Sequence, residues 1–364
     1  MLAEFDLKQL VDPLCGWFVK NARDLPWRRD PSPYHVWISE IMLQQTRVEA
    51  VKPYYARFIG TLPDVQSLAE CPEDVYLKLW EGLGYYSRVR NLHAAAVQIM
   101  EEHNGKIPDD YETLLKLKGI GHYTAGAICS LAYEKPVPAV DGNVLRVLTR
   151  VSGDDTDIMK QSFRTEVEKS LFALLEDVCP SGVSPKIFNQ GLMELGALIC
   201  APNGQPHCEE CPWKDLCIAK EKGLTDLLPV KKKAKARRIE ERTVFLIQDG
   251  DRVAIHKRPS KGLLAGLYEF PNHEGHFSEK ETLDFVRSMG FSPLRIRRLA
   301  DSVHIFSHVE WHMIAYYLLV EEEAFATEEQ KEKAAKEKLL FVDAAEQKEK
   351  YAVPSAFSAY KFEN

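Results

Sequence analysis

Apolar residues recur at helical spacing from the start of the chain to about residue 220. Segments 36–51 (VWISEIMLQQTRVEAV) and 75–100 place apolar side chains three and four positions apart, and short Gly and Pro turns separate such segments. This period predicts amphipathic helices that pack against one another. We therefore expect an all-α domain over residues 1–222.

The pattern changes in the last third of the chain. Segments 242–248 and 311–320 are rich in β-branched and aromatic residues, which is typical of strands, and 252–258 follows the first of them after an Asp-Gly-Asp turn. A capping box formed by Ser278 and Glu281 predicts one helix among the strands, and the charged segment 327–340 predicts an exposed helix. These signals predict an α+β domain over residues 242–364, joined to the helical domain by a linker over 223–241.

Composition and charge limit the classes of function. A chain of 364 residues with 45% hydrophobic content is long enough for two or three packed domains. The net charge of -7 argues against a protein that coats nucleic acid along its whole surface. The sequence VKKKAKARR (230–238) is the exception, and both a solvated linker and a phosphate-binding strap remain open for it.

The chain shows no sign of secretion or membrane insertion. Its first ten residues carry acids, and no stretch reaches the roughly 18 apolar residues that a membrane span needs. We expect a soluble, monomeric, cytoplasmic protein without a membrane partner.

Four of the eight cysteines gather within 18 residues. In a reducing cytosol such a group indicates a metal site rather than disulfides. Four thiolates suit an iron–sulfur cluster and also tetrahedral Zn²⁺, and the spacing alone leaves both open. The group consists of Cys200, Cys208, Cys211 and Cys217.

Two short motifs point to DNA chemistry. In LKGIGHYTA, Gly119 and Gly121 form a turn that opens an apolar helix, whose first amides can bind a phosphate; simple turn chemistry is the alternative. The turn predicts a helix-hairpin-helix at about residues 114–132. Asp141 precedes the next amphipathic helix in VDGNV, where it is also a favoured N-cap residue.

The hairpin, the VDGNV segment and the four-cysteine loop (200–217) together resemble the endonuclease III family of DNA glycosylases. The resemblance extends over nearly the whole chain, although the first cysteine gap, seven residues, is one longer than is usual in the family. It implies that the four cysteines hold one 4Fe-4S cluster. It also implies that Asp141 faces the sugar of a flipped nucleotide and stabilises positive charge at C1′.

The N-terminal segment 23–51 resembles the adenine-specific, MutY-type branch of that family. On a helix, Val36, Glu40, Leu43 and Arg47 share one face, so Glu40 lies between apolar neighbours and its pKa should rise. A carboxylic acid that stays protonated near neutral pH can protonate adenine, which makes adenine a better leaving group. Without the resemblance, an exposed helix glutamate would be the simpler interpretation.

The resemblance assigns further residues. Tyr123 stands where strand-cutting relatives carry a lysine nucleophile, so we expect no lyase activity and a supporting role for Tyr123 beside the two carboxylates. The implied adenine pocket consists of Arg23, Trp27, Arg28, Leu43 and Gln190. The implied DNA contacts are Gly119, Gly121, Asn143, Gln45, Thr46, Leu83, Gly84 and Tyr85, with Tyr85 stacking near the damaged guanine.

The segment 256–271 (HKRPSKGLLAGLYEFP) resembles the strand and loop that precede a Nudix box. Arg287 and Ser288 occupy the two acidic positions of that box, so we expect a Nudix-like domain without pyrophosphate hydrolysis. In the MutY-type branch this domain reads 8-oxoguanine with a Phe-Ser-His turn. Here that turn consists of Phe306, Ser307 and His308.

These expectations combine into a repair glycosylase that removes adenine paired with 8-oxoguanine or guanine in double-stranded DNA. A pyrimidine-damage glycosylase with lyase activity is the alternative within the family, and Tyr123 and the additional C-terminal domain disfavour it. A catalytically silent DNA-binding module is the alternative outside it. The presence of both Glu40 and Asp141 disfavours that alternative.

Overall fold

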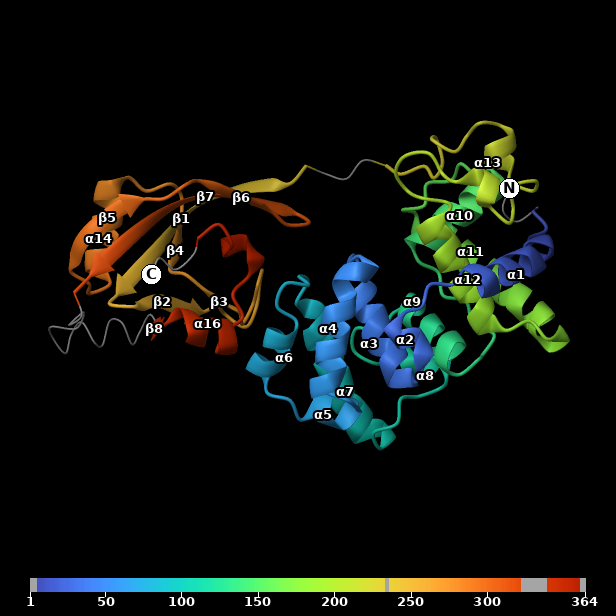
Figure 1. Cartoon of the computed structure of the whole chain (residues 1–364), viewed down its shortest axis with the longest axis horizontal. Helices are drawn as coiled ribbons and strands as arrows, with labels where there is room; N and C mark the ends of the chain where they lie inside the picture. The colour runs from blue at the N-terminus through green and yellow to red at the C-terminus, as the bar shows by residue number, and fades with distance from the viewer. Residues whose placement is uncertain (1–4, 233–235, 322–338, 361–364) are drawn as a thin grey trace. The chain divides into compact units, whose positions relative to one another are not determined.

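The structure, a computed structural model, describes residues 5–232, 236–321 and 339–360 (Figure 1). Its contacts divide the chain into two compact units, Met1–Cys71 with Arg90–Lys233 and Pro72–Val89 with Ala234–Asn364. Helices build the first unit and a sheet builds the second, as the hydrophobic pattern predicts. The grouping of 72–89 with the sheet unit differs from the continuous 1–222 domain that we expected.

The helical unit packs around α10 (Gly142–Ser152), which is buried from Val144 onward. The neighbouring helices are α1 (Val11–Asn21), α11 (Gln161–Val178) and α12 (Pro185–Leu198), and their apolar faces form one cluster with it. Gly196 lets α12 approach closely, because a Cβ there would lie 2.7 Å from the Cβ of Asn143. A larger residue at 196 would therefore push α12 away from α10.

Apart from α1, five helices lie between residues 7 and 69 of the described chain: η2 (Leu7–Leu10), α2 (Pro26–Arg29), α3 (Pro33–Leu43), α4 (Val48–Thr61) and α5 (Val65–Ala69). Ser32 begins α3 by accepting a hydrogen bond from the His35 amide at 3.2 Å. The expected continuous helix over 36–51 is wrong. The α3 helix ends at Leu43, and Gln45 takes a φ of 58°, so Arg47 does not continue the helical face of Glu40.

The helix-hairpin-helix is confirmed, with α8 (Tyr111–Leu114) and α9 (His122–Ala127) around the glycine turn. Helix α7 (Ser87–His103) packs beside the turn, and η3 (Ile128–Ala132) follows α9. Gly119 has a φ of 75°, and a Cβ there would lie 2.5 Å from the Cβ of Asn91. Only glycine satisfies both conditions.

The cysteine loop follows α12 and contains η5 (Cys208–Glu210) and α13 (Ile218–Glu221), and η4 (Cys179–Ser181) ends α11. Trp213 is buried, and its indole nitrogen donates a hydrogen bond to the Leu10 carbonyl at 2.9 Å. The loop is therefore fastened to the N-terminal segment. No helix in the described ranges combines the length and the apolar character needed to cross a membrane.

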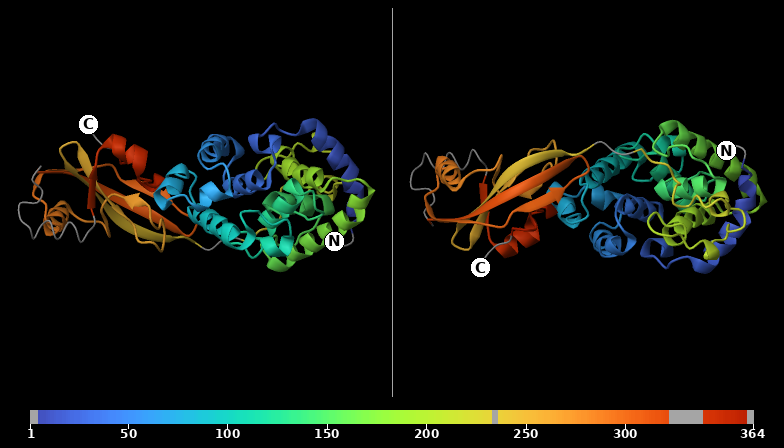
Figure 2. Two further views of the ribbon diagram at one scale, coloured as in Figure 1. Left: turned by 90° about the horizontal axis from the view of Figure 1, so that it is seen from below. Right: turned by 90° about the horizontal axis from the view of Figure 1, so that it is seen from above.

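Over its described residues, the sheet unit has eight strands: β1 (Arg238–Asp249), β2 (Arg252–Lys257), β3 (Tyr268–Glu269), β4 (Asn272–Glu274), β5 (Pro293–Arg298), β6 (Ser302–Ile305), β7 (Val309–Val320) and β8 (Leu339–Val342). Their order is β3-β2-β1-β7-β5, with β4 on β1, β6 on β7 and β8 on β2. The long strands β1 and β7 run parallel from Arg238↔Val309 to Gln248↔Leu319, and all other pairs are antiparallel (Figure 2).

Alternation along the central strands gives the sheet two apolar faces. Phe245 and Ile247 face α14 (Glu279–Ser288), which begins with the predicted capping box. Val244 and Leu246 face the C-terminal segment that contains η6 (Ser355–Phe357). The sheet is therefore covered on both sides.

Three elements of this unit differ from the prediction or add to it. The helix α16 (Ala344–Lys350) was not predicted, although Asp343 caps it. Of the helix predicted over 327–340, residues 327–338 lie outside the described ranges, and 339–340 belong to β8. The helix α6 (Glu73–Leu79) also joins this unit: the Lys78 ammonium donates a hydrogen bond to the Tyr351 carbonyl at 3.0 Å.

Candidate active site

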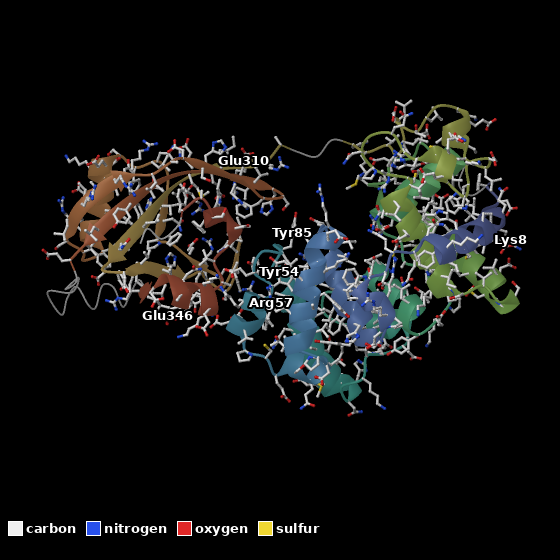
Figure 3. All side chains as sticks on the ribbon, viewed as in Figure 1. Lys8, Tyr54, Arg57, Tyr85, Glu310 and Glu346 are labelled. Carbon is white, nitrogen blue, oxygen red and sulfur yellow. The ribbon has the colours of Figure 1, made fainter. Side chains whose placement is uncertain are left out.

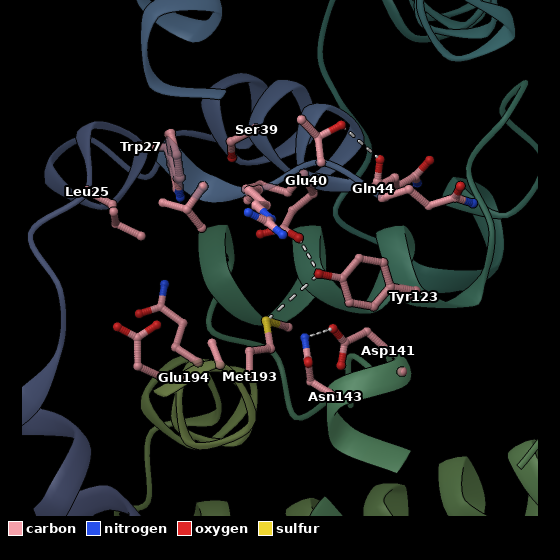
Figure 4. A pocket seen from close by; sticks show the side chains of 18 of the residues that line it. Leu25, Trp27, Ser39, Glu40, Gln44, Tyr123, Asp141, Asn143, Met193 and Glu194 are labelled. Carbon is pink, nitrogen blue, oxygen red and sulfur yellow. Dashed lines mark hydrogen bonds between the residues drawn. The ribbon is translucent and has the colours of Figure 1, made fainter. Parts of the chain in front are cut away.

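A pocket of about 1140 Å³ opens in the helical unit, walled by α2, α3, α10 and α12 (Figure 4). Its lining includes eleven of the residues assigned from the sequence, drawn from segments up to about 170 positions apart. They are Arg23, Trp27, Arg28, Glu40, Leu43, Gln45, Thr46, Tyr123, Asp141, Asn143 and Gln190.

Glu40 lies on α3 with only 5% of its surface exposed. The hydroxyl of Tyr123 on α9 donates a hydrogen bond to its carboxylate. Burial raises the pKa of Glu40 to about 7, because a charged carboxylate loses its hydration in the pocket, and the Tyr123 hydrogen bond opposes this rise. A carboxyl with this pKa is partly protonated at neutral pH and can act as a general acid.

Asp141 is the N-cap of α10 and also lines the pocket. Its carboxylate accepts hydrogen bonds from the Val144 amide at 2.8 Å and from the Asn143 side chain at 2.7 Å. Burial raises the pKa of Asp141, and these hydrogen bonds oppose that rise by favouring the charged form. Asp141 is therefore both a helix cap and a pocket residue.

A hydrogen-bonded path leads from Asp141 to the cysteine loop. The Arg146 guanidinium donates to the Asn143 side-chain oxygen at 2.8 Å and to the carbonyl of Cys200 at 2.9 Å. Asn143 in turn donates to Asp141. The position of the carboxylate thus depends on the fold of the loop.

Glu194 on α12 is a pocket residue that sequence reasoning missed. Its side chain is 1% exposed and accepts hydrogen bonds from both Arg23 and Arg28, whose guanidinium nitrogens lie 2.8–3.1 Å from its oxygens. These two cations lower the pKa of Glu194 to about 2 despite its burial. Glu194 follows Gln190 by four positions on one helix, so the helical period could have indicated it.

Other assigned residues lie outside this pocket. Gly119 and Gly121 form the hairpin turn of the same unit. In the sheet unit, Leu83, Gly84 and Tyr85 form the connection between α6 and α7. Leu83 is buried, whereas Tyr85 is 48% exposed and has a φ of 47°, an unusual conformation for a residue other than glycine (Figure 3).

The Phe306-Ser307-His308 turn connects β6 to β7 in the sheet unit. The Phe306 ring packs edge-on against the ring of Trp311, with 4.9 Å between the ring centroids. Trp311 is itself fully buried. The Ser307 hydroxyl lies 3.1 Å from Nδ1 of His308. The aromatic anchor therefore fixes a turn whose two polar side chains remain exposed.

At the two positions expected for the metal-binding acids of a Nudix box, Arg287 and Ser288 carry no carboxylate. Arg287 forms an ion pair with Asp284, and the Ser288 hydroxyl donates to the Phe285 carbonyl at 2.6 Å. Both residues therefore make local contacts at the end of α14. This arrangement agrees with a Nudix-like fold that has lost the metal-binding pair.

The four clustered cysteines line one small cavity together with Arg150. The Arg150 guanidinium lies 3.4 Å from Sγ of Cys200, and backbone N–H groups of Trp213 and Lys220 donate to Cys211 and Cys217. Such donors stabilise thiolates. Burial raises the pKa of Cys211 to about 12, and a bound cation would favour its ionised form.

The sulfurs line a cavity rather than meeting at a point. Over the residues that the structure describes, no three His, Cys, Asp or Glu side chains gather closely enough to hold a single metal ion. In an iron–sulfur cluster several iron atoms share the four thiolates. The donor set and its surrounding N–H groups fit such a cluster.

Comparison with known proteins agrees with both units. Residues 38–171 match the family profile "HhH-GPD superfamily base excision DNA repair protein", and residues 243–361 match the "NUDIX domain" profile. Adenine DNA glycosylase of Buchnera aphidicola (subsp. Schizaphis graminum) is 36% identical over 303 residues, which cover 83% of this chain and 85% of the relative. The mouse adenine DNA glycosylase is 34% identical over an alignment of 380 residues, which covers 88% of this chain and 73% of the relative.

Solved structures resemble the helical unit. A thermostable thymine-DNA glycosylase is 31% identical, covers 59% of this chain and 96% of its own, and superposes with a TM-score of 0.52. Endonuclease III in a non-covalent DNA complex shares the fold, with a TM-score of 0.50 at 23% identity over 60% of this chain and 96% of its own. With two family profiles and relatives matched over most of their length, the chain belongs to the adenine DNA glycosylase family of helix-hairpin-helix base excision repair proteins.

Proposed function

We propose that this protein is a monofunctional DNA glycosylase that hydrolyses the N-glycosidic bond of adenine paired with 8-oxoguanine or guanine. The observation that carries the proposal is the pair of unlike carboxyl groups in one pocket. Glu40 is buried and receives a hydrogen bond from Tyr123, whereas Asp141 accepts two hydrogen bonds that favour its charged form. Two titratable groups in different surroundings suit separate acid and anion roles.

In the first step, protonated Glu40 donates its proton to a ring nitrogen of the flipped adenine. The C1′–N9 bond breaks, its electron pair leaves with the base, and the sugar acquires oxocarbenium character. Asp141 remains anionic and stabilises the positive charge at C1′. Water then adds to C1′ and passes its proton to the Glu40 carboxylate, which returns the acid to its starting form.

The pocket walls hold the base in this account. Trp27 is buried and offers a rigid aromatic surface, supported by an edge contact to Tyr55 at 5.3 Å. Arg23, Arg28 and Gln190 supply polar groups, and Leu43 supplies an apolar one. We assign DNA-strand contacts to Gln45, Thr46, Asn143, Leu83, Gly84 and Tyr85, and phosphate binding to Gly119 and Gly121.

The sheet unit supplies recognition of the oxidised base. Ser307 and His308 offer exposed polar groups on a turn that Phe306 anchors, which suits hydrogen bonding to a damaged guanine. Arg287 and Ser288 stand at the acidic positions of the Nudix box, so this unit does no hydrolysis of its own. We place the protein, as a monomer, on the DNA of the cytoplasmic nucleoid.

One 4Fe-4S cluster completes the proposed enzyme, held by Cys200, Cys208, Cys211 and Cys217. When bound, it supplies a cross-link that fixes the loop carrying the Cys200 carbonyl, and through Arg146 and Asn143 this loop positions Asp141. Anaerobically purified protein should contain iron and sulfide with the visible absorption of such a cluster. Stoichiometric zinc without iron would contradict the assignment.

The chemistry is tested by incubating the protein with a duplex that carries adenine opposite 8-oxoguanine. The proposal predicts release of free adenine, an intact abasic strand, and little covalent product after borohydride treatment, because Tyr123 cannot form a Schiff base. Strand cleavage and borohydride trapping at the rate of base release would instead favour the lyase-competent alternative. Absence of adenine release would reject the function.

A further inference from the structure

The basic sequence where the two units join, residues 231–238, concentrates positive charge in a chain whose net charge is -7. Lys231, Lys232 and Arg237 are exposed. In the portion of the chain that the structure covers, no carboxylate forms an ion pair with any of these three, whereas Arg238 pairs with Glu240. Among the described residues, Lys231 and Lys232 therefore have no anionic partner, whereas the Arg237 side chain already donates to a backbone carbonyl.

The N-terminal end of this run is fastened to the helical unit. The Leu228 carbonyl accepts a hydrogen bond from the Arg150 side chain at 2.9 Å, and the Val230 carbonyl accepts one from the Ile158 amide at 3.1 Å. Leu228 is also buried. As a result Lys231 lies at the lining of the pocket that holds Glu40 and Asp141.

The C-terminal end is fastened to the recognition turn of the sheet unit. The Arg238 amide donates to the His308 carbonyl at 3.2 Å, and the Arg237 side chain donates to the Phe306 carbonyl at 3.1 Å. Each end of the basic sequence therefore places cations beside residues to which the proposed function assigns DNA.

We propose that Lys231 and Lys232, at the helical end of this basic sequence, bind backbone phosphates of the DNA duplex and so act as a phosphate-binding strap beside the pocket. This inference rests on the proposed function for the identity of the duplex. Phosphates carry no sequence information, so the strap should contribute equally to damaged and undamaged DNA. Its effect is therefore separable from base recognition and from catalysis.

The test is the salt dependence of DNA affinity for the full-length K231Q/K232Q variant. A plot of log K against log salt has a negative slope, and each lost phosphate contact should make it shallower by about 0.9. The slope of the double variant should therefore be shallower than that of the wild type by about 0.9 to 1.8. Kd is measured on a duplex with a non-hydrolysable 2′-fluoro-adenosine opposite 8-oxoguanine, and on an undamaged duplex of the same length. The same loss of slope is expected on both.

The matched control is K280Q/K348Q, which removes the same charge from two exposed lysines of the sheet unit outside the strap. The proposal predicts the wild-type slope for this control. An unchanged slope for K231Q/K232Q, or an equal loss in the control, would overturn the strap. The measurement on the undamaged duplex is a binding affinity and needs no base release. It therefore tests the strap even if the protein releases no adenine.

Discussion

The hydroxyl of Tyr123 donates a hydrogen bond to the carboxylate of Glu40 inside the pocket. Burial raises the pKa of Glu40 to about 7, and this bond opposes the rise because it favours the charged form. The adenine excision rate should therefore fall about tenfold per pH unit above about pH 7, where Glu40 loses its proton.

Replacing Tyr123 by Phe should move the falling limb to higher pH, because the carboxylate loses its hydrogen bond and the pKa of Glu40 rises further. Single-turnover rates between about pH 5 and pH 9 locate the pH above which the excision rate falls. A lower maximum rate alone would also follow from a packing defect. If the rate falls at the same pH as in the wild type, Tyr123 does not act on Glu40.

Glu40→Gln and Asp141→Asn should each reduce adenine excision by roughly 10²–10⁴-fold or more while duplex binding persists, because neither residue is the main phosphate contact. Near-normal excision by either variant would remove that residue from the mechanism. Electrophoretic mobility shifts on the mispaired duplex provide the control for binding.

Glu40→Gln should lower activity but raise the free energy of unfolding above neutral pH. The unfolded carboxyl releases its proton near its ordinary pKa of 4.5 and the folded one near 7, so the free energy of unfolding falls as pH rises between these values. The neutral variant avoids this loss, and should be more stable by about 3 kcal/mol at pH 8. Equal denaturant midpoints at pH 8 would contradict the burial argument.

Glu194→Gln should make the excision rate begin to fall at a lower pH than in the wild type, whereas Tyr123→Phe should make it fall at a higher pH. The positive charge of Arg28 lowers the pKa of Glu40, while Asp141 raises it. Removing the Glu194 charge leaves Arg23 and Arg28 uncompensated, so Glu40 should ionise at lower pH. Excision above pH 7 should then fall by about tenfold for each pH unit that the limb moves. Glu176→Gln, an exposed change on α11, is the control. A rate loss that is uniform across pH would indicate only a structural role.

Ser307→Ala should weaken the preference for 8-oxoguanine over guanine opposite adenine. One lost hydrogen bond of about 0.5–1.5 kcal/mol corresponds to about 2- to 13-fold. Competition between the two duplexes measures this ratio, with Ser302→Ala on β6 as the control. An unchanged ratio would assign the discrimination to Gln45, Thr46 and Tyr85 instead.

Local chemistry made much of this site predictable. Asp141 lies at an N-cap and Gly119 in a Gly-x-Gly turn, and both features can be read within a few residues. The alternation of strands and the capping box of α14 likewise follow from short patterns. These features needed no knowledge of distant contacts. The burial of Glu40, by contrast, was expected because segment 23–51 resembles the adenine-specific branch.

The remaining features depend on contacts between distant segments. Glu194 meets Arg23 across 171 positions, and Lys78 meets Tyr351 across 273. The helical period relates Glu194 to Gln190, but no local pattern encodes its ion pair with Arg23 or the grouping of 72–89 with the sheet unit, so both were missed. The break at Gln45 was missed because the apolar period continues through it, while the backbone there takes a positive φ.

The central claim is adenine excision directed by the opposite base. The most direct measurement compares single-turnover base release from three duplexes that carry adenine opposite 8-oxoguanine, adenine opposite thymine, and thymine glycol opposite adenine. Our account predicts rapid release of adenine from the first duplex and negligible release from the other two. Release of thymine glycol with strand cleavage, or equal release of adenine from the first two duplexes, would contradict it.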